Sequence, residues 1–388
     1  MSGQQIGTDG ERPNNGATPA TASPTVATAQ TRRLIDVEDL RTSFRTARGQ
    51  VKAVDGVSLS LDRGRTLGIV GESGSGKTVL SRSIMGLLPK RNVERSGKVV
   101  YEGVDMLTAS ADEVRDLWGA EMAMIFQDPM TSLNPVLRIG NQITEGMRYH
   151  LGLDRKTADK NALALLREVG IPQPDRRLRQ YPHELSGGMR QRVMIAVALA
   201  CGPKLLFADE PTTALDVTVQ AQILNLLQRE QRERDMGMIL VTHDLGVVAG
   251  RTDEIAVMYA GQIVEKAPTA TLFRHVRMPY TEALLRSIPV LNAPSHTRLQ
   301  AIPGRPPDLI NPPSGCRFAP RCPYVQDKCR EEAPPLIEAE PGHSFRCWFP
   351  VGASPVELTP KPAEATTADP AGTAGTPGTA GTAEEAGH

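Results

Sequence analysis

Gly71-Glu72-Ser73-Gly74-Ser75-Gly76-Lys77-Thr78 fits G-x-x-x-x-G-K-[ST], the pattern of a P-loop. An apolar run at 66–70 precedes the stretch and predicts a short buried strand, and apolar residues from Val79 to Leu88 follow it at helical spacing. Strand, glycine-rich loop and helix together form the arrangement that holds a nucleoside triphosphate. A glycine-rich turn before an ordinary helix is the alternative, and Lys77-Thr78 in register argue against it.

The residue types of this loop suit a phosphate ligand. Glycines let backbone N–H groups turn toward the phosphates without Cβ clashes, and the helix N-terminus adds the positive end of its dipole. Lys77 is expected to place its charge on the β- and γ-phosphates, while the hydroxyl of Thr78 is available to Mg²⁺. The predicted ATP ligands are Gly71, Ser73, Gly74, Ser75, Gly76, Lys77 and Thr78.

Length and composition limit the classes of protein to which this chain can belong. The 388 residues suffice for two domains with tails, and the 44 basic and 44 acidic residues argue against a general nucleic-acid-binding surface. No apolar run approaches the ~18 residues of a membrane span, and no secretory signal is evident. We therefore expect a soluble chain that reaches a membrane only through a partner. Residues 1–32 and 351–388 contain almost no large apolar side chains, which predicts disordered tails.

The pattern along the chain predicts an α/β fold. Strands are expected from Leu34 and through 51–61, around turn signals at Arg48-Gly49 and Asp55-Gly56, and again at 97–101 and 122–126. A helical insertion follows at about 130–190. Further strands at 205–208 and 238–242, a helix at 217–235 between them, and a hairpin around Gly261 complete a mostly parallel sheet. Ligands of such a sheet bind at the carboxyl ends of the strands.

Asp209-Glu210 end the buried strand at 205–208. One carboxylate there can hold Mg²⁺, and the next can position or deprotonate a water molecule. Solvated surface carboxylates are the alternative when such a pair stands alone. Phe44, near the end of the first strand, could stack on an adenine ring or be an ordinary aromatic of the core or of a sheet edge.

The order of the motifs gives the strongest indication. Gln127, Leu185-Ser186-Gly187-Gly188, Asp209-Glu210, Ala214-Leu215-Asp216 and His243 follow the P-loop in the order of an ABC transporter ATP-binding subunit, which the chain resembles over 34–264. This implies an ABC-type cassette at 33–267: a P-loop core with a mostly parallel sheet, an antiparallel β subdomain and an α-helical subdomain.

The resemblance also implies a role for each motif. Glu210 would be the catalytic carboxylate, Asp209 the Mg²⁺ carboxylate, Gln127 a sensor of Mg²⁺ and water, and His243 the γ-phosphate switch. The signature residues Ser186, Gly187 and Gly188 would contact the ATP held by a second ATPase chain. Asp216 is also predicted to bind the nucleotide. Met189 stands where many members have Gln, which leaves the phosphate-contacting part intact.

The segments 126–135 and 190–196 resemble the dipeptide/oligopeptide importer branch in particular. That branch implies two membrane permease subunits, an extracytoplasmic solute-binding protein, a partner ATPase chain that is more often different than identical, and a peripheral location on the cytoplasmic face. The branch also serves nickel and other small solutes. A non-transport ABC ATPase is disfavoured by the single cassette without a coiled-coil insertion, and a mere assembly anchor by the presence of Glu210 and His243.

Four of the five cysteines lie near the C-terminus, at Cys316, Cys322, Cys329 and Cys347, within a predicted extension at 268–350. Aromatic residues cluster there, so we expect a small packed unit. It is too short to fold by apolar burial alone and needs a cross-link, such as a metal site or disulfides. The spacings exceed those of common zinc ribbons, which favours a 4Fe-4S cluster over Zn²⁺; the unmetallated or disulfide-linked forms remain alternatives. His343 is interpreted as a surface residue that could substitute as a ligand.

Overall fold

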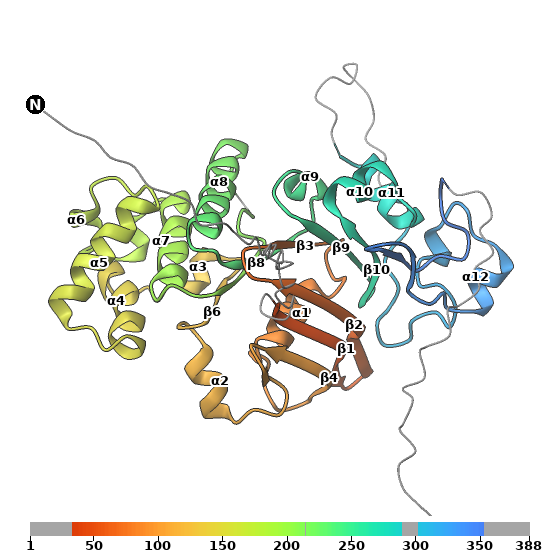
Figure 1. Ribbon diagram of the computed structural model, residues 1–388, viewed down its shortest axis with the longest axis horizontal. Helices are drawn as coiled ribbons and strands as arrows, with labels where there is room; N and C mark the ends of the chain where they lie inside the picture. The colour runs from red at the N-terminus through yellow and green to blue at the C-terminus, as the bar shows by residue number, and fades with distance from the viewer. Residues whose placement is uncertain (1–32, 214, 289–301, 353–388) are drawn as a thin grey trace, which may run out of the picture.

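The computed structural model describes residues 33–213, 215–288 and 302–352. The tail predicted at 1–32, most of the tail predicted at 351–388, and Ala214 of the predicted motif lie outside the described residues. Two sheets and a group of helices make up the described part (Figure 1).

The larger sheet contains the parallel strands at whose carboxyl ends the site residues are predicted. Its strands stand in the order β11-β12-β10-β9-β3-β8-β7-β6, and β6, β7, β8, β3 and β9 are parallel neighbours, as expected. The parallel strands β3, β7 and β8 are buried throughout, which explains their continuous apolar sequence. Its strands are β3 (Thr66–Val70), β6 (Met122–Ile125), β7 (Leu205–Asp209), β8 (Gly237–Thr242), β9 (Glu254–Tyr259), β10 (Gln262–Pro268), β11 (Ile337–Glu340) and β12 (His343–Phe345).

The second sheet is antiparallel, with the order β2-β1-β4-β5. Its strands are β1 (Arg33–Thr46), β2 (Gly49–Asp62), β4 (Val93–Tyr101) and β5 (Val104–Asp105). The predicted turn at Asp55-Gly56 is wrong: both residues lie inside β2, where the register with β1 shifts and Gly56 has φ of 75°. A bulge and a turn both favour glycine at positive φ, so the sequence alone does not distinguish them.

Helices fill the predicted insertion and flank the larger sheet. The helices between β6 and β7 form a separate group at the left of Figure 1, which agrees with the predicted helical insertion. The helices are α1 (Lys77–Ile84), α2 (Ala111–Leu117), α3 (Pro129–Ser132), α4 (Ile139–His150), α5 (Arg155–Glu168), α6 (Pro174–Arg177), η2 (Pro182–Glu184), α7 (Gly187–Leu199), α8 (Val217–Glu233), α9 (Leu245–Val248), α10 (Thr269–Arg274), α11 (Pro279–Arg286), η3 (Ala319–Arg321) and α12 (Asp327–Glu331).

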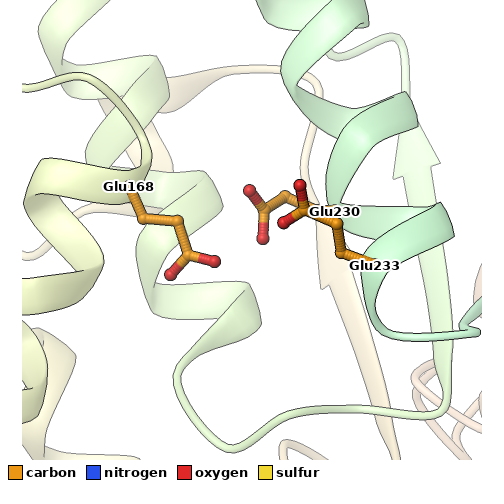
Figure 2. Close-up of side chains that lie close together, drawn as sticks. All are labelled: Glu168, Glu230 and Glu233. Atoms are coloured by element: carbon orange, nitrogen blue, oxygen red, sulfur yellow. The ribbon is translucent and has the colours of Figure 1, made fainter.

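Three carboxylates meet where the helical group joins α8. Glu168 at the end of α5 points toward Glu230 and Glu233 on α8 (Figure 2). Arg234 donates to both Glu168 (2.9 Å) and Glu230 (3.1 Å), and Arg229 donates to Glu230 (2.9 Å). Burial raises the pKa of Glu168; it acts the same way on Glu230, but hydrogen bonds from Arg229, Glu168 and Arg234 bring the pKa of Glu230 below its ordinary value. Because the guanidinium groups of Arg229 and Arg234 already pair with these three carboxylates, we interpret the cluster as an ion-pair network that joins the helical group to α8.

The C-terminal residues continue the main sheet. β12 pairs with β10, and Phe318, Phe345 and Cys347 belong to the same hydrophobic core as the strands β7 to β9. From the sequence we expected this segment to need a metal or disulfide cross-link. That expectation ignored the cassette, which supplies the apolar surface that a short segment lacks. His343 is not a surface residue as interpreted from the sequence. Its side chain is 1% exposed, and its Nε2 lies 2.8 Å from Oε1 of the equally buried Glu265.

Candidate active site

The P-loop joins β3 to α1 and wraps closely around neighbouring backbone. Gly74 and Gly76 adopt φ of 81° and 102°, which favours glycine over residues with a side chain. A Cβ at Gly71 would collide with the carbonyl oxygen of Met258, and one at Gly76 with that of Ala53. The sequence pattern therefore reflects a real steric demand, and the loop leads into the N-terminus of α1 as predicted.

Lys77 is a buried cation at the centre of this site. Its Nζ donates to the carbonyl oxygens of Gly71 (2.8 Å) and Glu72 (3.1 Å) and lies 3.9 Å from Oε1 of Glu210. Its side chain is only 4% exposed. Burial lowers the pKa of Lys77, although Glu210 and Asp209 act in the opposite direction. A buried cation held by neutral carbonyls can turn toward an anionic ligand without crossing solvent.

Asp209 ends β7 and is fully buried. Its Oδ1 accepts a hydrogen bond from the hydroxyl of Thr78 (3.1 Å), which brings together two of the three predicted Mg²⁺ ligands. Its Oδ2 and the hydroxyl of Ser75 are buried without a hydrogen-bond partner among the described residues. Burial raises the pKa of Asp209. An unpaired buried carboxylate oxygen beside a threonine hydroxyl fits a hard divalent cation, because both groups are oxygen ligands.

Glu210 is the residue on which the other predicted catalytic groups converge. Its Oε2 accepts hydrogen bonds from Nε2 of Gln127 (2.9 Å) and from Oγ1 of Thr213 (3.0 Å), and it lies 3.2 Å from Nδ1 of His243. Glu210 also has φ of 47°, in a region that non-glycine residues rarely adopt. Such backbone strain persists where the surroundings fix it, and it is concentrated at functional sites.

Parallel strands explain this convergence. Gln127 follows β6, Glu210 follows β7, His243 follows β8 and the P-loop follows β3, and these four strands lie side by side in the sheet. Their carboxyl ends therefore meet at one edge, as predicted. The arrangement can hold a phosphate chain and a cation, and it places a carboxylate beside them to accept a proton.

Thr213 was missed from the sequence. It orients the carboxylate of Glu210, yet it lies in an ordinary loop sequence, Pro211-Thr212-Thr213, which carries no signal for this contact.

Other predicted ligands lie apart from this cluster. Ser186 and Asp216 are exposed and cap α7 and α8, accepting hydrogen bonds from Met189 N (3.4 Å) and Val219 N (2.9 Å). Gly187 is exposed and Gly188 half-buried at the start of α7, which lies away from α1 (Figure 1). No hydrogen bond within the described part of the chain joins these residues to the P-loop.

Phe44 is half-buried in β1, opposite Val51 of β2. Its contact with adenine stays a prediction.

The four C-terminal cysteines surround one small cavity, together with Phe318 and Trp348. All four are free thiols, with Cys329 and Cys347 buried and Cys316 and Cys322 half-buried. Within the ranges that the structure describes, three ligand atoms from Cys, His, Asp or Glu lie within 4.8 Å of one another only at Glu168, Glu230 and Glu233. The four sulfurs are therefore spread more widely than a tetrahedral zinc site requires, where neighbouring sulfurs are about 3.8 Å apart.

Within the described residues, none of the helices has the length and apolar character needed to cross a bilayer.

Two family models match the chain. The model described as "ABC transporter" matches residues 54–213, and that described as "Oligopeptide/dipeptide transporter, C-terminal region" matches residues 264–329. The second match begins within β10 and ends at Cys329, so it includes three of the four clustered cysteines.

Curated relatives are similar along most of their length. The oligopeptide transport ATP-binding protein OppD of Bacillus subtilis is 51% identical over 82% of this chain and 89% of its own. The dipeptide transport ATP-binding protein DppD of Escherichia coli is 49% identical over 82% of this chain and 97% of its own. The dimeric, post-hydrolysis ATP-binding cassette MJ0796, bound to ADP and phosphate, superposes with a TM-score of 0.56 at 25% identity and covers 61% of this chain and 99% of its own. The chain therefore belongs to the ATP-binding proteins of ABC transporters, in the group that contains the oligopeptide and dipeptide transport ATP-binding proteins.

Proposed function

We propose that this chain hydrolyses ATP to energise the uptake of dipeptides or oligopeptides through a membrane permease. The proposal rests mainly on one observation: Gln127, Thr213 and His243 converge on Glu210, and Glu210 lies beside the P-loop cation Lys77. Relatives that are about half identical and are named for peptide transport support the choice of cargo. Nickel or another small solute is the alternative cargo for the same machinery.

The chemistry follows from the positions of these groups. Lys77 and the P-loop backbone bind the β- and γ-phosphates of ATP, and Thr78, Gln127 and Asp209 would hold Mg²⁺, which offsets the charge of the phosphates. A water molecule beside Glu210 attacks the γ-phosphorus, the bond to the ADP oxygen breaks, and the carboxylate of Glu210 takes a proton from the water. Gln127 and Thr213 hold that carboxylate, and His243, whose Nδ1 lies 3.2 Å from Oε2 of Glu210, would contact the γ-phosphate.

We also propose that the complete site forms between two ATPase chains. The exposed N-terminus of α7, with Ser186, Gly187 and Gly188, resembles a second anion site, and no hydrogen bond among the described residues joins it to this chain's own P-loop. The dimeric cassette among the similar structures supports this arrangement. The partner chain would be a related ATPase, and the pair would bind two permease subunits on the cytoplasmic face of the membrane. An extracytoplasmic solute-binding protein would deliver the cargo.

Uptake of a labelled peptide tests this function. A strain without this chain should lose uptake of labelled di- and oligopeptides, and the wild-type chain should restore it. The Glu210→Gln chain, expressed at the same level, should not. Restored uptake of nickel but not of any peptide would reassign the cargo, and normal peptide uptake without the chain would contradict the proposal.

We further propose that residues 268–350 form an extension of the cassette at 33–267, with a 4Fe-4S cluster at Cys316, Cys322, Cys329 and Cys347. All four thiols line one cavity, and their wide spacing suits a cluster better than a single Zn²⁺. Thiolate ligands of a cluster would supply a covalent connection between segments that are otherwise joined by packing. The cavity itself is only about 10 Å³, so the other side chains that line it, such as Phe318 and Trp348, would shift to admit a cluster.

Metal analysis of the chain purified without oxygen checks this assignment. We expect about four iron and four sulfide per chain, the stoichiometry of the cluster. Cys322→Ala and Cys347→Ala should lose both. Cys201→Ala is the matched control, because Cys201 follows α7 in the helical group, and it should keep both. Stoichiometric zinc without sulfide, or no metal at all, would contradict the cluster.

A further inference from the structure

A bidentate ion pair joins the C-terminal extension to the P-loop. Nη1 and Nη2 of Arg321, in η3, donate to Oε2 and Oε1 of Glu72 at 2.6 and 2.9 Å. Glu72 is the second residue of the P-loop, and 249 positions separate it from Arg321. The Arg321 side chain is 3% exposed and that of Glu72 is 27% exposed, so the pair is largely shielded from solvent. A shielded, two-pronged contact of this kind fixes geometry as well as charge.

Residues outside the P-loop hold Glu72 at a second point. Its backbone N–H donates to the hydroxyl of Tyr280 in α11 (2.9 Å). Tyr280, Tyr259 and Phe318 form one aromatic cluster, with ring centroids 4.5 to 5.4 Å apart, and Arg321 lies over the rings of Tyr259 and Phe318. The extension therefore restrains both the backbone and the carboxylate of Glu72.

Glu72 in turn contacts the phosphate-binding residues. Its carbonyl oxygen accepts hydrogen bonds from Nζ of Lys77 and from the backbone N–H of Ser75, both at 3.1 Å. A shift of Glu72 would therefore move the cation that binds phosphate. Without Arg321, moreover, the carboxylate of Glu72 would stand unpaired beside a site for a polyanion and would repel it.

We propose that Arg321 is a positioning residue for the P-loop: by pairing with Glu72 it neutralises and fixes that residue, and so sets the affinity for the nucleoside triphosphate. This inference rests on the ATP site proposed above. Arg321 lies in the chain between Cys316 and Cys322, so the same contact connects the four-cysteine segment to the nucleotide site.

A double-mutant cycle on the full-length chain tests the proposal through ATP affinity, measured by calorimetry with Mg²⁺ and ATP. Arg321→Gln should weaken ATP binding about 10-fold, because it leaves the carboxylate unpaired. Glu72→Gln should weaken binding only about 2-fold, and the double variant should resemble Glu72→Gln, since no charge is then left to repel the phosphates. Arg321→Lys should recover part of the loss. In steady-state turnover the change should appear in KM for ATP and leave kcat within about 2-fold.

Two further variants separate the possible failures. Arg277→Gln breaks a comparable ion pair of the extension, Arg277 with Glu340 (2.7 Å), which does not contact the P-loop, and it should leave ATP affinity unchanged. Lys77→Ala should abolish ATP binding; if it does not, the ATP site itself is wrong. With that site confirmed, near wild-type affinity of Arg321→Gln, or equal and additive losses in the two single variants, would overturn the role of Arg321.

Discussion

Replacing Glu210 with glutamine is expected to leave ATP binding intact and to lower ATP turnover by a factor of about 10³, the scale of general-base catalysis. Glutamine keeps the shape of the side chain and can still accept a hydrogen bond from Thr213, but it cannot take a proton from water. The P-loop contacts of Lys77 with Gly71 and Glu72 do not involve Glu210 and should persist.

Phosphate release at saturating ATP and calorimetric ATP affinity measure the two parts of this prediction. Glu233→Gln is the matched control: it makes the same change on an exposed carboxylate of α8, and it should turn over ATP at the wild-type rate. Turnover of Glu210→Gln within about threefold of wild type would show that another group takes the proton. Loss of ATP binding would instead show that the Lys77–Glu210 pair organises the P-loop.

The parts of the site that a continuous segment encodes could be predicted well. The P-loop is such a segment, and its glycines occupy positions where φ or a neighbouring carbonyl oxygen excludes other residues. Gln127, Glu210 and His243 could be placed together because each follows a strand of one parallel sheet, whose carboxyl ends must coincide. Local pattern and general topology were sufficient for these groups.

Contacts between distant segments were not predictable in the same way. Arg321 and Glu72 meet across 249 positions, and neither the arginine nor the glutamate stands in a pattern that identifies its partner. His343 was misinterpreted for a related reason: its burial depends on the pairing of β12 with β10, and a three-residue strand shows no periodicity in the sequence. The left-handed backbone of Glu210 is likewise imposed by its surroundings rather than by its residue type.

Ser186→Arg is the second substitution with a large expected effect, because it places a bulky cation where the proposed partner site needs a close backbone approach. Ser186 is exposed, and its side chain caps α7 through Met189 N, so the variant should also lose that cap at a cost of about 1 kcal/mol in stability. The chain's own P-loop is unchanged, so ATP affinity of the isolated chain should stay near wild type. In a dimer of two Ser186→Arg chains, both sites carry the changed signature, and turnover should fall by two orders of magnitude or more.

Mixing two inactive chains distinguishes a site shared between chains from a site within one chain. In a mixed pair of Ser186→Arg and Lys77→Ala, the intact P-loop of the first chain faces the intact signature of the second. If the chain pairs with itself, random pairing of equal amounts makes half of the dimers mixed. Each mixed dimer has one complete site out of two, so about a quarter of wild-type turnover should return. If the natural partner is a different ATPase chain, Ser186→Arg should instead silence the site at the partner's P-loop and leave the site at this chain's own P-loop active. The contradicting result is a Ser186→Arg chain whose own P-loop site is inactive both in the mixture with Lys77→Ala and in a pair with a different ATPase chain. That result would show that the signature acts on the nucleotide bound by the same chain.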